Sequence, residues 1–295
     1  MEVIIILFVS VLWSLVGVLV KSSSLMMNSS VITFCRFFFG IIFLGLLMMF
    51  KNRKIRLCWK SKWIWLGAAG KCCNYICENL ALTIGHSYGN ILIVPFQTIF
   101  LILASVLFFK ERLGLKSLTA AALSLIGGFL ISWNGLPLSV LFQSNAVTTL
   151  LFLLSAVGTS FHVLSQKLLI DTLDSGNMNF SMFLWCSLAT ALPLPFNFKF
   201  TGSFNIWSLL ALVCLGFITG ISFYLYADAL GKVPFLFAVI ISNSSVLFAL
   251  LWSHLFYKEP ITMYIISGTV IFLIGIIMLN IPKGVSLRRI ISLKP

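Results

Sequence analysis

Ionisable and amide side chains lie within a segment that is otherwise strongly apolar. Lys71 and Glu78 are seven residues apart, which places them on the same face of a helix. Asn74 and Tyr75 fall between them on that face. Lys71 lies too far from either end of the segment for its ammonium group to reach water easily. We therefore expect this helix to line a polar cavity; the alternative is a buried pair between Lys71 and a partner that the sequence does not identify.

Arg36 lies in the preceding apolar segment, at a depth similar to that of Glu78. A charged side chain is costly in a lipid bilayer, so we expect these two residues to pair with each other. Two roles for the pair remain open. It is either a static link between two helices, or a gating and coupling element in which the Glu78 carboxylate exchanges a proton or binds a cationic cargo.

A second pair of ionisable residues lies near the opposite ends of two later apolar segments. His162 and Asp228 are the candidates for an inner polar cluster that acts as a second gating or coupling element. The alternative for Asp228 is a simple ion pair with Lys232 or Lys167 at the membrane surface.

Polar and aromatic side chains elsewhere in the apolar segments are candidates for contacts with a cargo. Gln97 and Asn243 lie at the middle of their segments, where we expect a substrate to bind. Trp13, Tyr224 and Tyr226 are candidate cavity residues because an aromatic ring can hold a cation on its face.

Composition indicates which solvent surrounds these segments. Apolar residues make up 60% of the 295-residue chain and charged residues 9%, whereas soluble domains have roughly 45–50% and about 25%. The chain has room for about ten spans of roughly 20 residues each. We predict an all-α integral membrane protein with ten transmembrane helices, near residues 3–20, 31–50, 63–82, 87–109, 115–133, 147–166, 178–196, 206–228, 233–257 and 261–281.

The distribution of basic residues predicts the topology. With a cytoplasmic N-terminus, fifteen of the 20 Lys and Arg residues lie in inner loops or in the C-terminal tail, and three lie in outer segments. This asymmetry follows the positive-inside rule and predicts that both termini are cytoplasmic. The net charge of +13 thus reflects topology and contact with anionic lipid, and we expect no nucleic-acid partner.

The chain also contains an internal repeat. When residues 81–111 are set over residues 229–259, ten positions are identical without a gap, including an Ala-Leu pair at the start and a Lys-Glu pair at the end. We predict two five-helix repeats, residues 1–134 and 146–282, followed by a basic cytoplasmic tail, residues 283–295. Because five is odd, the second repeat enters the membrane from the opposite side, an arrangement common in secondary transporters.

The repeated motifs resemble those of the EamA-type permeases in the drug/metabolite transporter superfamily. Trp13 is similar to the family's tryptophan in the first helix, while the corresponding position of the sixth helix, often Trp in the family, is Gly158. The other matching motifs are Arg36-Phe37, Glu78-Asn79-Leu80-Ala81-Leu82 with Lys110-Glu111-Arg112, and Tyr224-Leu225-Tyr226-Ala227-Asp228-Ala229-Leu230 with Lys258-Glu259-Pro260. The resemblance covers essentially the whole chain and implies membrane transport without indicating the substrate.

These observations predict a secondary transporter of small polar metabolites, either amino-acid-like or amine solutes, in the plasma membrane. It would work by alternating access, with proton coupling and exchange both open. The alternative is a flippase or scramblase for lipid-linked sugars. We expect no enzymatic activity, cofactor or metal. The expected partners are a small-molecule substrate and the lipid bilayer, with H+ as an open alternative, and the protein is expected to be a monomer or a homodimer.

Overall fold

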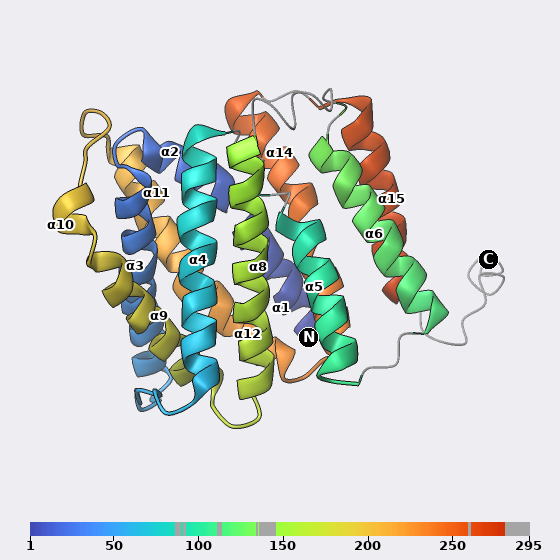
Figure 1. Cartoon of the computed structure of the whole chain (residues 1–295), viewed down its shortest axis with the longest axis horizontal. Coiled ribbons are helices and arrows are strands. Elements are labelled where there is room, and N and C mark those ends of the chain that lie inside the picture. The colour runs from blue at the N-terminus through green and yellow to red at the C-terminus, as the bar shows by residue number, and fades with distance from the viewer. Residues whose placement is uncertain are drawn as a thin grey trace.

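The structure, a computed structural model, describes residues 1–85, 90, 93–110, 114–133, 135, 146–258 and 261–280. The regular elements of these residues are all helices (Figure 1). One isolated antiparallel bridge joins Met27 to Phe200. The division into two repeats stays a prediction, and the expected tail belongs to residues 281–295, which lie outside the described residues.

The helices follow one another with short connections. In the first half of the chain they are α1 (Glu2–Ser14), α2 (Val16–Ser24), α3 (Ser29–Phe50), α4 (Lys62–Ile84), α5 (Ile93–Leu107) and α6 (Leu115–Trp133). In the second half they are α8 (Ala146–Leu169), α9 (Ser175–Ala191), α10 (Leu194–Asn197), α11 (Ile206–Phe217), the π-helical segment η2 (Ile218–Ser222), α12 (Phe223–Leu230), α13 (Phe235–Ser242), α14 (Ser245–Tyr257) and α15 (Met263–Asn280).

Several helical stretches have the length and hydropathy needed to cross a membrane. In the described residues there are five, namely Glu2–Ser24, Ser29–Phe50, Val147–Leu169, Ile206–Leu230 and Phe237–Tyr257, and shorter apolar helices accompany them. Helix α4 is as long as these, with 23 residues, but its polar residues lower its hydropathy. The chain is therefore a multi-pass membrane protein.

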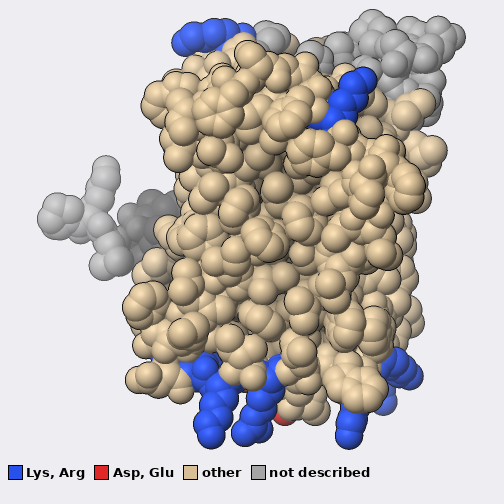
Figure 2. All heavy atoms as spheres, turned by 90° about the vertical axis from the view of Figure 1, so that its left-hand side faces the viewer, with Lys and Arg blue, Asp and Glu red and all other residues tan. Residues whose placement is uncertain are grey.

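The molecular surface agrees with this assignment. Figure 2 shows Lys and Arg side chains at the two ends of the bundle, with an uncharged band between them. Large apolar side chains such as Phe38 and Phe217 are exposed, at 43% and 41%. We call the end that carries residues 51–62 the basic end. A band of this kind matches the hydrocarbon core of a bilayer.

Polar side chains mark where several helices begin. Asn28, Ser61, Asp174 and Asn205 precede α3, α4, α9 and α11, and each accepts a hydrogen bond from a backbone N–H of the first turn. Caps of this type satisfy N–H groups that have no partner within the helix. They fix the helix starts at the ends of the bundle.

Glycine allows the closest helix contacts. Helix α4 packs along α8, and α6 packs along α15 (Figure 1). A Cβ atom at Gly158 would lie 2.5 Å from the Gly70 carbonyl oxygen, and one at Gly127 would lie 2.6 Å from that of Gly268. Small residues let backbones approach in this way, and such packing drives helix association in lipid.

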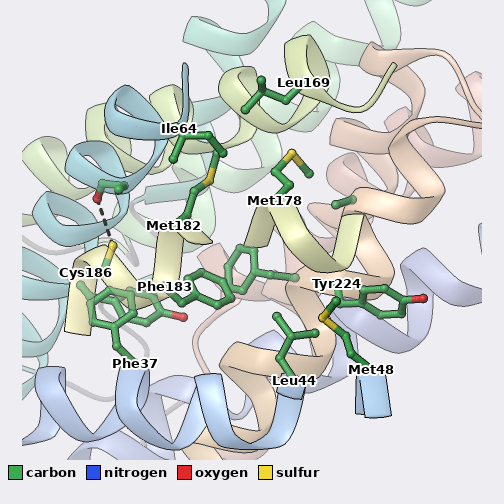
Figure 3. Packing of buried hydrophobic residues seen from close by; sticks show 14 residues of the cluster. Phe37, Leu44, Met48, Ile64, Leu169, Met178, Met182, Phe183, Cys186 and Tyr224 are labelled. Atoms are coloured by element: carbon green, nitrogen blue, oxygen red, sulfur yellow. Dashed lines mark hydrogen bonds between the residues drawn. The ribbon is translucent and has the colours of Figure 1, made fainter. Parts of the chain in front are cut away.

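A buried cluster between α3, α4, α9 and α12 supports the polar part of the bundle. Phe37 stacks on Tyr75 with ring centroids 4.9 Å apart, and Phe183 lies beside Phe37 (Figure 3). The Cys186 thiol donates a hydrogen bond to the Ala68 carbonyl oxygen of α4, at 3.2 Å. This packing fixes the face of α4 that carries the polar stripe.

Several of the expected helices contain interruptions: 3–20 is broken at Leu15, between α1 and α2, and 178–196 is broken between α9 and α10. Two further interruptions follow in the second half of the chain. The expected helix 206–228 includes the π-helical segment η2, and the expected helix 233–257 is broken at Asn243 and Ser244, between α13 and α14. A π-helical turn commonly occurs at functional sites because it changes the direction of the side chains that follow. Both interruptions lie beside the cavity described next.

Candidate functional site

A cavity of about 100 Å³ lies between helices from both halves of the chain. The first half contributes α1 to α5 and the second half α8 and the α12 to α14 region. Its lining residues are Trp13, Val16, Arg36, Lys71, Asn74, Tyr75, Glu78, Asn90, Ile93, Val94, Gln97, Thr159, Val163, Phe223, Ser242, Asn243 and Ser245. The cavity thus includes the expected polar stripe of α4.

Arg36 is the centre of a buried polar network in this cavity. Its Nη1 atom donates hydrogen bonds to Glu78 Oε2 at 3.1 Å and to Asn79 Oδ1 at 2.6 Å. Its guanidinium carbon lies 3.5 Å from the centroid of the Tyr75 ring. The Arg36 side chain is 2% exposed and that of Glu78 10%. The expected contact between Arg36 and Glu78 is present, while its role stays a prediction.

Asn79 extends this network and was not singled out from the sequence. It is fully buried and donates from Nδ2 to Thr33 Oγ1 at 2.8 Å. The amide group therefore accepts from Arg36 of α3 with its oxygen and donates to Thr33 of the same helix with its nitrogen. Its position directly after Glu78 in an apolar helix was the available signal.

Lys71 lies in the same cavity, among aromatic and amide groups. Its Nζ atom donates to Asn74 Oδ1 at 2.8 Å and lies 4.1 Å and 3.8 Å from the ring centroids of Tyr75 and Phe223. Asn74 in turn donates to Ser155 Oγ of α8 at 2.7 Å. Asn74 thus holds the Lys71 side chain in place, and Ser155 of the second half in turn holds Asn74.

The π-helical segment supplies two further contacts. The hydroxyls of Tyr75 and Thr219 are 3.0 Å apart, and Trp13 Nε1 donates to Ser222 Oγ at 2.7 Å. Both partners belong to η2. This segment therefore orients one aromatic wall residue from α1 and one from α4.

The amide residues expected to contact a substrate also lie at the cavity. Gln97 lines it from α5, and Asn243 lines it from the break between α13 and α14. Asn243 Nδ2 donates to Thr98 Oγ1 of α5 at 2.9 Å. The two halves therefore meet here through polar side chains at the middle of the bundle.

Tyr224 and Tyr226 are not among the described residues that line this cavity, and their expected role stays a prediction. The Tyr224 hydroxyl accepts a hydrogen bond from Lys51 Nζ at 3.2 Å, at the basic end. Tyr226 is 1% exposed and packs against Trp13, with ring centroids 4.9 Å apart. Instead, Phe223 is the aromatic residue of α12 that reaches the cavity.

His162 and Asp228 have different partners and form no common cluster in the described part of the chain. His162 is fully buried, and its Nδ1 atom lies 3.1 Å from the Gly67 carbonyl oxygen. Asp228 accepts a hydrogen bond from Lys232 Nζ at 2.6 Å, as in the alternative stated above. This hydrogen bond raises the pKa of Lys232.

The fold and the site together define a class of protein. A helical bundle with an apolar perimeter and charged side chains in an internal cavity is typical of a multi-pass membrane protein. The model of the EamA-like transporter family matches residues 1–133 and again residues 147–281. The chain therefore belongs to the EamA-like transporter family, and it is a membrane transporter of the drug/metabolite transporter superfamily.

Similarity to known structures supports the fold alone. A structure described as "Crystal structure of protein" is similar to this chain with a TM-score of 0.78 and 16% sequence identity. The match covers 94% of this chain and 97% of the other. No curated protein matches this chain.

Proposed function

We propose that this protein is a secondary transporter that moves small polar metabolites by alternating access between two inverted five-helix repeats. The observation that carries the proposal is the cavity itself. Charged side chains of the first half, and amide side chains of both halves, line a partly open space within an otherwise apolar bundle. Such residues are costly in a membrane and commonly mark a substrate or ion pathway.

The pattern of helix contacts supports the repeat. In the proposed repeat, α1 and α2 correspond to α8, α4 corresponds to α11 and α12, and α5 corresponds to α13 and α14. Helix α4 packs on α8, and its counterparts α11 and α12 pack on α2 and α1. Helix α5 also packs on α8, and its counterparts α13 and α14 pack on α1. A pattern of this kind is expected when the two halves have related folds.

Polar contacts at both ends of the bundle are candidates for gates. At the end opposite the basic end, Lys21 Nζ donates to the Gly85 carbonyl oxygen at 2.5 Å, and Ser22 and Tyr257 are joined by a hydrogen bond of 3.1 Å. At the basic end, Lys51 contacts Tyr224. Alternating access requires the two sets to break in turn.

The finer parts of the proposal are the ten spans, the cytoplasmic termini, the plasma membrane and the choice between proton coupling and exchange.

Purified protein in liposomes tests the central part of the proposal, which is transport of a small polar solute. Labelled amino acids, amines, organic acids and nucleotides are offered with and without a pH gradient. We expect saturable uptake or exchange of at least one small polar solute, absent from protein-free liposomes. If every solute fails to enter or exchange, the proposal is wrong.

A further inference from the structure

The cavity carries an excess of positive charge. Among the described residues that line it, the charged side chains are Arg36, Lys71 and Glu78. Arg36 and Glu78 form an ion pair, whereas no ion pair joins Lys71 to a carboxylate in the part of the chain that the structure describes. Among the described residues, the Lys71 side chain therefore lies in the cavity without a carboxylate within ion-pair distance.

The surroundings of Lys71 favour a cation but do not neutralise it. The side chain is 1% exposed, and its nitrogen contacts the Asn74 amide oxygen and the faces of two aromatic rings. Aromatic faces and amide oxygens attract an ammonium group. A buried charge without a counter-charge still has a large desolvation cost, which an anion bound beside it would offset.

The size of the cavity limits the cargo. Its volume is about 100 Å³, smaller than the cavity of about 150 Å³ that accommodates benzene. A solute that fits here has on the order of six non-hydrogen atoms or fewer. A solute of this size is much smaller than a nucleotide or a lipid-linked sugar.

Building on the proposed transport function, we propose that the cargo is a small organic monoanion whose carboxylate pairs with Lys71. Gln97 and Asn243, which line the same cavity, are placed to bind its other polar groups. A carboxylate matches the single uncompensated positive charge. An amine would add a second one, and a zwitterion would leave the net charge of the site unchanged.

Three solutes of nearly equal size test this assignment. Lactate, alanine and 1-amino-2-propanol share a three-carbon skeleton and carry a net charge of −1, 0 and +1 near neutral pH. Their exchange is measured in liposomes without a membrane potential, with protein-free liposomes as the control for passive entry. We expect saturable exchange of lactate, with at least tenfold lower rates for the two other solutes.

Two variants connect the preference to the charge in the cavity. Lys71→Gln should reduce lactate exchange by about tenfold or more, because truncating one partner of a buried charged contact is costly. Lys62→Gln removes a lysine from an exposed position on the same helix and should leave exchange unchanged. Glu78→Gln raises the positive charge of the cavity and should shift the preference from lactate toward the dianion oxalate.

The results separate this inference from the function on which it rests. Exchange of alanine or 1-amino-2-propanol in preference to lactate would overturn the anion assignment while supporting transport. The same holds if none of the three solutes moves but an amine, an amino acid or a nucleotide of the wider panel does. Unchanged lactate exchange by Lys71→Gln would also overturn it. If no solute of any class moves, both proposals fail.

Discussion

Arg36 makes three different contacts with one helix. Its guanidinium group binds the Glu78 carboxylate and the Asn79 amide, and it lies over the Tyr75 ring. A buried ion pair adds little net stability, since desolvation offsets most of the attraction, but the loss of one partner leaves an unpaired buried charge. The pair therefore joins α3 to α4 in a way that depends on both partners.

Replacing only Arg36 should destabilise the protein strongly. We expect Arg36→Met to lower the free energy of unfolding by about 3–5 kcal/mol, because Glu78 is then buried without a partner. The double variant Arg36→Met, Glu78→Leu should recover most of this loss. Unfolding by SDS in mixed micelles measures both values. A double variant no more stable than the single one would contradict this account.

The sequence revealed the charged residues of the site better than its neutral ones. Lys71, Glu78 and Arg36 are conspicuous because charge is rare in apolar helices. Asn79 was noted only as part of a motif, and Ser155 was not noted, because uncharged polar residues so often serve only to join helices. His162 could not be assigned from sequence, since its partner is a backbone carbonyl group that no side-chain pattern reveals.

At the scale of helices, the contact between α4 and α8 depends on glycine. Gly158 lies where the resemblance to the family led us to expect tryptophan, and its Cα faces the Gly70 carbonyl oxygen and the Asn74 N–H group of α4. A larger residue would push apart the helix that carries Lys71 and the helix that carries Ser155. The departure from the family motif is thus explained by close packing.

Gly158→Val should therefore destabilise the protein by about 1–3 kcal/mol or more, since added side-chain atoms would overlap the α4 backbone. Gly114→Ala is the control, because a Cβ atom there has no described neighbour within 4 Å. Thermal unfolding in detergent compares the two. Equal melting temperatures for both variants would show that the helices are not packed as described.

The π-helical segment η2 holds two aromatic residues of the cavity wall. Thr219→Val removes the hydroxyl that contacts Tyr75, and we expect it to reduce stability by about 1–2 kcal/mol and to slow transport. In the control Thr190→Val, the lost hydroxyl bonds only to carbonyl groups of its own helix. If both variants transport alike, the contact between Tyr75 and Thr219 is unimportant.

Hydropathy located most helices but not their interruptions. The apolar runs of α3 and α8 correspond closely to the expected segments 31–50 and 147–166. Hydropathy gave no sign of η2, a π-helical turn that redirects the side chains after it. Phe223 directly follows this turn and lines the cavity, while the roles expected of Tyr224 and Tyr226 stay predictions.

At the scale of the whole molecule, the distribution of charge predicts its orientation. Lys60 lies at the basic end, and Ser203 lies in the connection between α10 and α11 at the opposite end. In a variant without native cysteines, we expect Lys60→Cys to react with a membrane-impermeant thiol reagent only from the cytoplasm and Ser203→Cys only from outside. Labelling of both positions from the same side would contradict the proposed topology.

Alternating access is the central claim, and one cysteine in the cavity tests it directly. Gln97→Cys, in the same cysteine-free background and in sealed liposomes with one orientation, is exposed to the impermeant reagent from each side separately. The account predicts labelling from both sides, while position 60 and position 203 are each labelled from one side only. Labelling of position 97 from a single side, or from neither side, would contradict it.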